Sequence, residues 1–455
     1  MEKRYSLDMT SGPFIKKILL FSVPLILTGL LQLAYNSADI IVVGRFVGKE
    51  ALAAVGSTGS LVNLFLNLFL GLSMGTGVMV ARHIGEGDDG SVRNCVHTAM
   101  LTALISGFFI GTVGFFMSPV MLRIMGVPDD VMELASLYLK IYFLGSPGLL
   151  IYNFGASVVR ATGDTKRPLY FLSISGLVNV VLNLVLIIVF HMGVSGVAIA
   201  TIVSQYLSAV FIIIYLLRMP NACRLEPGKL RICSAELKSI LRLGLPAGIQ
   251  NSLFSVSNVL IQSTVNSFGS VAMAGIAAGS NYDSYVYTCT NAIAQTTMTF
   301  TSQNMGAKKF ENVGKVYRYC LILTTVAGFG MGMLGCAFAN PIVSLFSDDP
   351  DVIIIGADRL LLIMPFYVFC SLMDVAASQI RGMGKSFEPM IVSLIGACGV
   401  RLLWVYFVLP FNHTLHFLYW AYPISWSVTF FAQFAMYFVL KHRMRKNGEL
   451  SNSAE

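Results

Sequence analysis

Long apolar segments constrain this chain more than any other feature of its sequence. A stretch of about 20 apolar residues crosses a bilayer as a helix. We count about twelve such segments, at residues 14–43, 52–79, 94–117, 131–158, 168–190, 194–217, 238–268, 271–302, 313–340, 351–380, 386–411 and 415–440. An open strand edge would leave backbone polar groups without partners in lipid. The sequence therefore predicts an all-α integral membrane protein with twelve transmembrane helices.

The composition and the placement of charge support a membrane protein. Only 12% of the residues are charged, about half the usual share of a soluble domain, and the mean hydropathy is +0.72. The net charge of +8 does not indicate nucleic acid, because the basic residues gather at the ends of alternate segments. Placing the N-terminus inside puts most of the 31 Lys and Arg on the cytoplasmic side. We therefore expect both termini to be cytoplasmic.

The chain contains an internal repeat. The segment from Arg160 to Pro168 returns from Arg381 to Pro389, with Arg, Gly and Pro at the same offsets and a shift of 221 residues. Repeats in a polytopic membrane protein indicate a transporter whose site lies between the halves. We expect an N-terminal six-helix lobe at 1–217, a cytoplasmic linker at 218–237, a C-terminal six-helix lobe at 238–441 and a polar cytoplasmic tail at 442–455.

Motifs of soluble enzymes are absent or out of context. No P-loop is present, and the six histidines are scattered rather than clustered for catalysis. The eight cysteines show no paired spacing for a disulfide framework or a metal site. A G-x-G-x-x-G match at Gly330–Gly335 lies within an apolar segment without a preceding strand, so close helix packing explains it better, as it does Gly71-x-x-x-Gly75. We expect neither an enzyme nor a nucleotide-binding protein.

Three acidic residues lie well inside the predicted helices: Asp39, Asp283 and Asp374. A charged group within a membrane is costly and is by default a functional candidate. Two other interpretations stay open. Asp39 can lie near the external interface, and an acid of the second half can form a structural pair with an arginine such as Arg401, deep in the eleventh segment.

The first predicted helix carries a polar stripe above a proline. Gln32, Tyr35 and Asp39 follow i, i+3, i+7 spacing and share one helix face. Pro24, earlier in the same helix, removes a backbone hydrogen bond and favours a bend. A polar stripe beyond a bend indicates a cavity wall that can move.

A second polar stripe follows the fifth predicted helix. Ser175, Asn179 and Asn183 repeat at i, i+4, i+8, while Thr201 lies on the sixth helix and Asn153 on the fourth. Such amides and hydroxyls either bind a ligand or form hydrogen bonds between neighbouring helices. The residues alone leave both roles open.

With these features the chain resembles the multidrug and toxic compound extrusion (MATE) family, in particular the bacterial branch whose key acid is on helix one. The resemblance covers the twelve helices as 6+6, the paired Arg-x-x-Gly turns, and the Gly-Glu-Gly-Asp and Gly-Ala-Lys-Lys segments after helices two and eight. It implies two lobes around a central cavity in the plasma membrane. It also implies a secondary antiporter that exports amphipathic, often cationic, organic compounds in exchange for protons or sodium by alternating access.

The resemblance also assigns roles to residues. By this resemblance, the first-lobe substrate site would contain Gln32, Tyr35 and Asn153. An ion-coupling site would contain Asp39, Asn179, Asn183 and Thr201, which could supply four oxygens to sodium. For proton coupling, the carboxyl group of Asp39 alone would be enough. Where the branch often has a second Asp, this chain has Asn183, so one charge is lost. Asp283 and Asp374 would attract cationic substrate in the second lobe, Pro24 would be the bend of helix one, and no cofactor besides the coupling ion is expected.

Two other functions provide alternatives. A flippase that exports a lipid-linked precursor would want many Arg and Lys residues around its cavity to bind phosphate, whereas the deep basic residues here are chiefly Lys140 and Arg401. A membrane-embedded hydrolase or transferase would need His, Asp or Ser clustered on facing helices. The amides and carboxylate of the first half favour the antiporter, with small organic cations or amphipathic drugs and membrane lipid as its partners.

Overall fold

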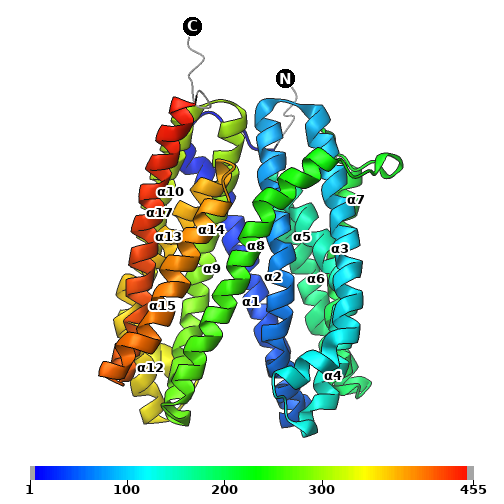
Figure 1. The fold of residues 1–455 in the computed structure, drawn as a ribbon. Helices are drawn as coiled ribbons and strands as arrows, with labels where there is room; N and C mark the ends of the chain where they lie inside the picture. Colours follow the sequence, from blue (N-terminus) through cyan, green and yellow to red (C-terminus); the bar gives the residue numbers. More distant parts are fainter. Residues whose placement is uncertain (1–5, 448–455) are drawn as a thin grey trace. The chain divides into compact units, whose positions relative to one another are not determined.

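A computed structural model describes residues 6–447, without the side chains of residues 49, 50, 52, 57, 60, 61, 63, 64 and 130 (Figure 1). Within that range the chain forms helices and turns and no β-strand. The helices are α1 (Phe14–Phe46), α2 (Lys49–Glu86), α3 (Asp89–Ile124), α4 (Asp129–Leu144), α5 (Ser146–Ala161), α6 (Lys166–Leu184), α7 (Gly193–Leu217), α8 (Ser234–Asn266), α9 (Ser270–Gly306), α10 (Phe310–Ala337), α11 (Ala339–Ser344), α12 (Pro350–Ile363), α13 (Tyr367–Gly382), α14 (Phe387–Ser393), α15 (Val400–Leu403), α16 (Leu415–Tyr419) and α17 (Ala421–Lys446).

Each of the twelve apolar segments expected from the sequence forms a helix or a broken helix, so the all-α fold class is confirmed. Among the described residues, nine helical spans are long and apolar enough to cross a membrane. A tenth consists of α4 and α5, which meet at 46° around Gly145. The remaining two segments, α8 and α9, contain more polar residues. The break at Gly145 was not expected from the sequence.

Short π-helical and 3-10 segments interrupt several of these helices. The π-helix η1 (Val185–Val189) follows α6, and η4 (Leu394–Gly399) and η5 (Trp404–Val408) lie on either side of α15. The 3-10 segments are η2 (Pro227–Lys229), η3 (Met364–Phe366) and η6 (Leu409–Phe411). Segments of π-helix are rare and occur preferentially at functional sites.

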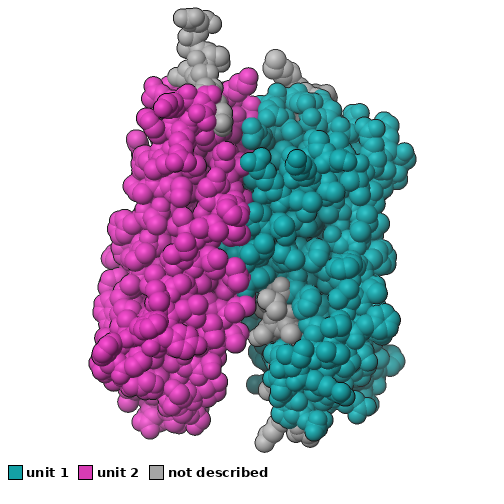
Figure 2. All heavy atoms as spheres, in the orientation of Figure 1, with its two compact units in different colours: residues 1–8, 23–252 teal, residues 9–22, 253–455 magenta. Residues whose placement is uncertain are grey.

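The chain divides into two compact units, which we describe separately (Figure 2). Unit 1 contains residues 6–8 and 23–252, and unit 2 contains residues 9–22 and 253–447 of the described chain. The division falls inside α1 and inside α8, so it does not follow the predicted lobe boundaries at 217 and 238. The predicted tail at 442–455 begins within α17, which continues to Lys446, and residues 448–455 lie outside the described range.

In unit 1, α2 and the first half of α8 approach each other through glycines. A Cβ atom added to Gly71 would lie 2.3 Å from the backbone nitrogen of Gly248, and one added to Gly75 would lie 2.6 Å from the carbonyl oxygen of Ile240. On the facing helix, a Cβ at Gly244 would lie 2.5 Å from Cα of Leu72. Both helices therefore present a Gly-x-x-x-Gly face, which permits close backbone packing in a membrane.

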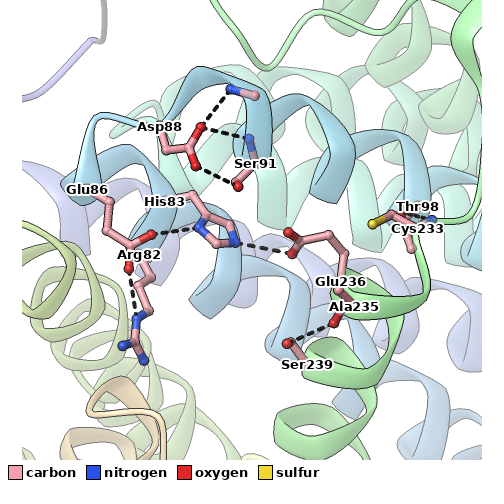
Figure 3. A network of polar contacts seen from close by, with 11 residues as sticks. Arg82, His83, Glu86, Asp88, Ser91, Thr98, Cys233, Ala235, Glu236 and Ser239 are labelled. Atoms are coloured by element: carbon pink, nitrogen blue, oxygen red, sulfur yellow. Dashed lines mark hydrogen bonds and ion pairs between the residues drawn. The ribbon is translucent and has the colours of Figure 1, made fainter.

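The predicted linker at 218–237, whose last residues form the first turn of α8, contacts α2 and α3. His83 Nδ1 contacts Glu86 at 2.8 Å and His83 Nε2 contacts Glu236 at 3.1 Å (Figure 3). The backbone N–H of Cys233 donates to Thr98 Oγ1 at 3.0 Å. These contacts join residues far apart in sequence, so the predicted linker is an ordered part of unit 1.

Two carboxylates in this region are held in their charged form. The hydrogen bond from the Lys229 ammonium lowers the pKa of Glu226. The Ser91 hydroxyl and backbone N–H both donate to Asp88, which caps α3 and has a lowered pKa. Both groups lie outside the membrane-spanning helices, at the ends where the sequence places its charge.

The contact between His83 and Glu236 predicts a measurable contribution to stability. Glu236→Gln should lower the free energy of unfolding by about 1–2 kcal/mol, because a mostly buried charge-assisted hydrogen bond is weakened. Thermal unfolding in detergent, together with protease cleavage between residues 218 and 233, measures the effect. Glu311→Gln is the matched control, since Glu311 is 75% exposed and its pair with Lys315 spans 3.9 Å. Equal unfolding temperatures for the two variants would contradict this assignment.

Candidate functional site

The two polar stripes predicted from the sequence meet in unit 1, where α1 packs against α6. Asn183 Nδ2 donates a hydrogen bond to Asp39 Oδ1, and the same amide lies 3.4 Å from Asn179 Oδ1. Asn179 and Asn183 are both buried, while Asp39 is partly buried. The structure therefore brings together three of the four expected ion-coupling residues.

Tyr35 packs on α6 beside this contact. Its hydroxyl donates to the carbonyl oxygen of Ser173 at 3.1 Å. The ring lies on Gly176, where an added Cβ would lie only 1.9 Å from Tyr35 Cε2. Gly176 is therefore required for this approach. Gly176 was not expected from the sequence, although it directly follows Ser175 of the polar stripe on this helix.

The carbonyl oxygen of the Asn183 side chain is an unusual feature of the site. It is buried and has no hydrogen-bond partner among the described residues. A buried polar atom without a partner is costly. The oxygen and nitrogen of a side-chain amide exchange places when the amide rotates by a half turn. Such a rotation of the Asn183 amide would turn its oxygen toward Asp39 and Asn179. Three oxygens would then converge, an arrangement that a bound cation or a proton stabilises.

An apolar cluster lies one turn beyond Asp39. Val42 and Val43 of α1 pack with Tyr138 of α4 and with Val194 and Val197 of α7 in a buried cluster. Such packing excludes water and raises the cost of an unpaired charge next to it. Asp39, the acid of the first polar stripe, thus borders a dry region.

The remaining first-lobe candidates are not linked to Asp39. The hydroxyl of Thr201 donates to Val197 O at 3.0 Å, and the amide of Asn153 donates to Leu149 O at 2.8 Å, both within their own helices. Gln32 is exposed on α1. Among the described residues, no hydrogen bond connects Thr201 or Asn153 to Asp39, so these roles stay predictions.

Pro24 lies one residue after Val23, where α1 passes from unit 2 to unit 1. The Thr28 hydroxyl donates to Pro24 O at 2.7 Å. On the preceding turn, the Ser22 hydroxyl contacts Thr296 of α9 at 2.8 Å, within unit 2. The proline thus marks the point where α1 changes the set of helices with which it packs. The predicted bend stays a prediction.

The two acids of unit 2 differ in their surroundings. Asp283 on α9 forms a two-point ion pair with Arg359 of α12, with Nη1 at 3.2 Å from Oδ1 and Nη2 bonded to Oδ2. Arg359 is only 4% exposed. Asp374 is partly buried on α13, two turns before Arg381. The structural Asp–Arg pair left open by the sequence therefore exists, but it uses Arg359 rather than Arg401.

Comparison with known proteins places the chain among transporters. The family model described as MatE matches residues 24–185 and 246–407. A probable multidrug resistance protein, YpnP of Bacillus subtilis, is 29% identical over 85% of this chain and 87% of its own length. A protein of Shewanella oneidensis named FAD transporter is 24% identical over 87% of each chain. A MATE family multidrug resistance transporter, solved in an outward-facing conformation, has a TM-score of 0.89 at 22% identity, covering 96% of this chain and 98% of its own.

Gly176→Ala should destabilise the protein by about 1–3 kcal/mol, because the new methyl group has no room beside Tyr35. Thermal unfolding measures this loss. Gly330→Ala is the control, because nothing lies within 4 Å of its added Cβ in α10 and alanine favours a helix. Adding Tyr35→Ala to the Gly176 variant should recover part of the loss through favourable coupling. Strictly additive effects would argue against the contact.

Asp283→Asn should cost about 3 kcal/mol of stability, because it leaves the Arg359 guanidinium buried without its counter-charge. The double variant with Arg359→Leu should be less impaired than the single variant, since both charges are then removed. Unfolding in detergent compares these with Asp358→Asn, whose carboxylate is 47% exposed. An effect of Asp283→Asn no larger than that of the control would refute a structural role.

Proposed function

Because the chain belongs to the MatE family, the multidrug and toxic compound extrusion transporters, we propose that it is a secondary multidrug efflux antiporter. It exports amphipathic organic compounds by alternating access in exchange for an inward-moving cation. Relatives named as multidrug resistance proteins support this proposal. The lipid-linked precursor flippase is the alternative that the transport assays below distinguish.

The observation that carries the proposal is the hydrogen bond between Asp39 and Asn183 in unit 1. Asp39 is the acid of the first-half stripe, and Asn183 donates to its carboxylate. A substrate cation and a coupling ion both gain by neutralising this carboxylate, and only one can do so at a time. An ion drives a conformational equilibrium only through unequal affinity for its two states. Competition between the substrate and the ion for Asp39 supplies this difference in affinity.

The coupling ion is either a proton or sodium. A proton needs only the carboxyl group of Asp39. Sodium needs several oxygens, and Asp39, Asn179 and a rotated Asn183 amide would provide them. The Thr201 hydroxyl would join as a fourth ligand only after leaving the carbonyl of Val197. Sodium binding therefore requires more rearrangement than protonation.

Family membership does not fix the charge of the substrate. One relative is named an FAD transporter, and FAD is an anion with two phosphates. Other relatives are named multidrug resistance proteins, a name that specifies no substrate charge.

The distribution of Lys and Arg supports an orientation in the plasma membrane in which both termini are cytoplasmic. Export would then proceed from the cytoplasm outward.

Asp39→Asn should abolish ion-driven efflux of ethidium while the protein stays folded, because asparagine cannot exchange a proton and binds a cation weakly. Proteoliposomes with a proton gradient and a sodium gradient imposed separately give the measurement. Asp358→Asn, which alters an exposed acid, should retain wild-type efflux. Full efflux by the Asp39 variant would refute the coupling role. Absence of wild-type efflux under both gradients would favour the flippase.

A further inference from the structure

Arg401 is a buried cation of unit 2 that the efflux proposal does not use. It lies on α15 and is only 6% exposed. Its Nε donates to Ser425 Oγ at 3.1 Å, and its Nη1 donates to Asn258 Oδ1 at 3.1 Å. The guanidinium carbon lies 4.7 Å from the ring centre of Tyr422 and 5.9 Å from that of Trp426. Neutral groups of α8 and α17 thus surround the charge.

No carboxylate among the described residues contacts this guanidinium directly. Arg401 forms no ion pair with any carboxylate of the described chain, whereas Arg359, which is also buried, is paired with Asp283. Burial of a charge without a partner is costly. The aromatic rings offset part of that cost. The two N–H groups on Nη2 make no hydrogen bond to a described residue, so they are free to donate to a ligand.

The internal repeat gives this position a counterpart in the first half. The two MatE matches begin at 24 and 246 and end at 185 and 407, so both ends follow one shift of 222 residues. The shift is 222 at these ends and 221 at the Arg160–Pro168 repeat, so Arg401 corresponds to Asn179 or to its neighbour Val180, and Asp39 corresponds to Ile261 or Leu260. The first half carries an acid where the second half carries an apolar residue, and the second half carries a cation where the first half carries a neutral residue. The two halves therefore differ in charge at equivalent positions.

The local backbone is irregular at the same place. The four residues of α15 lie between two π-helices, η4 and η5. In the first half, the π-helix η1 begins two residues after Asn183. A π-segment shifts the side chains that follow it around the helix, and such segments persist mainly at functional sites. Irregular backbone therefore accompanies the polar positions of both halves.

We propose that Arg401, with Asn258, Tyr422 and Trp426, forms a binding site in unit 2 for the carboxylate of an aromatic acid. The planar guanidinium presents paired N–H donors that match a carboxylate. The two aromatic side chains provide apolar and π contacts for a ring attached to it. That the ligand of this site is a transported substrate rests on the proposed efflux function. The substrates would then include anionic or zwitterionic aromatic compounds besides cations.

Equilibrium binding of dansylglycine and of its uncharged amide to the purified full-length protein tests the site, because the two probes share one fluorophore. The wild type should bind the acid about tenfold more tightly than the amide, the ratio expected for a hydrogen bond to a charged group. Arg401→Gln should bring this ratio close to one. Arg401→Lys should give an intermediate ratio, because lysine keeps the positive charge but lacks the paired N–H donors of a guanidinium. Arg123→Gln changes an exposed arginine of α3 and should keep the wild-type ratio.

Competition on the wild-type protein keeps the test decisive if an Arg401 variant does not fold. Benzoate should displace bound dansylglycine, and benzamide should do so about tenfold less well. Equal affinity of the wild type for acid and amide, or an unchanged ratio in a folded Arg401→Gln variant, would overturn the inference. Ethidium efflux separates the two proposals: efflux without acid preference refutes only the unit 2 site, and acid preference without efflux refutes only the antiporter.

Discussion

Lipid offers no hydrogen bonds, and this constraint determines most of the structure. Every backbone polar group in a span must be satisfied by its own helix, which leaves helices as the elements of this chain. Side chains follow the same requirement. In α9, for example, the hydroxyls of Thr296 and Thr297 donate to carbonyls one turn earlier. A polar group that instead finds its partner on another helix, as Asp39 does on Asn183, is therefore informative.

Small residues and a proline set how the helices meet. Glycine faces allow α2 and α8 to pack at backbone distance within unit 1, and Gly176 allows the ring of Tyr35 to lie on α6. Pro24 occurs where α1 leaves the helices of unit 2 for those of unit 1. A proline removes one backbone hydrogen bond at that point. The backbone hydrogen bonding of α1 is therefore interrupted where the helices that pack against it change.

Much of this organisation could be predicted from the sequence, because apolar length and repeat offsets are local properties. The twelve segments, the polar stripes and the glycine face at Gly71 and Gly75 were all identified in that way. The structure shows what depends on contacts distant in sequence: the partner of Asp283 is Arg359, and Glu236 meets His83. Spacing could not reveal that Thr201 bonds to its own helix, nor that the fourth span breaks at Gly145.

The function that we propose depends on competition between substrate and coupling ion for Asp39 in unit 1. Equilibrium binding of ethidium to the purified protein tests it most directly, with the proton and sodium concentrations varied one at a time. Raising the concentration of the coupling ion should weaken ethidium binding, and Asp39→Asn should remove this dependence. An ethidium affinity of the wild type that is independent of both ions would show that neither ion competes with the substrate at Asp39.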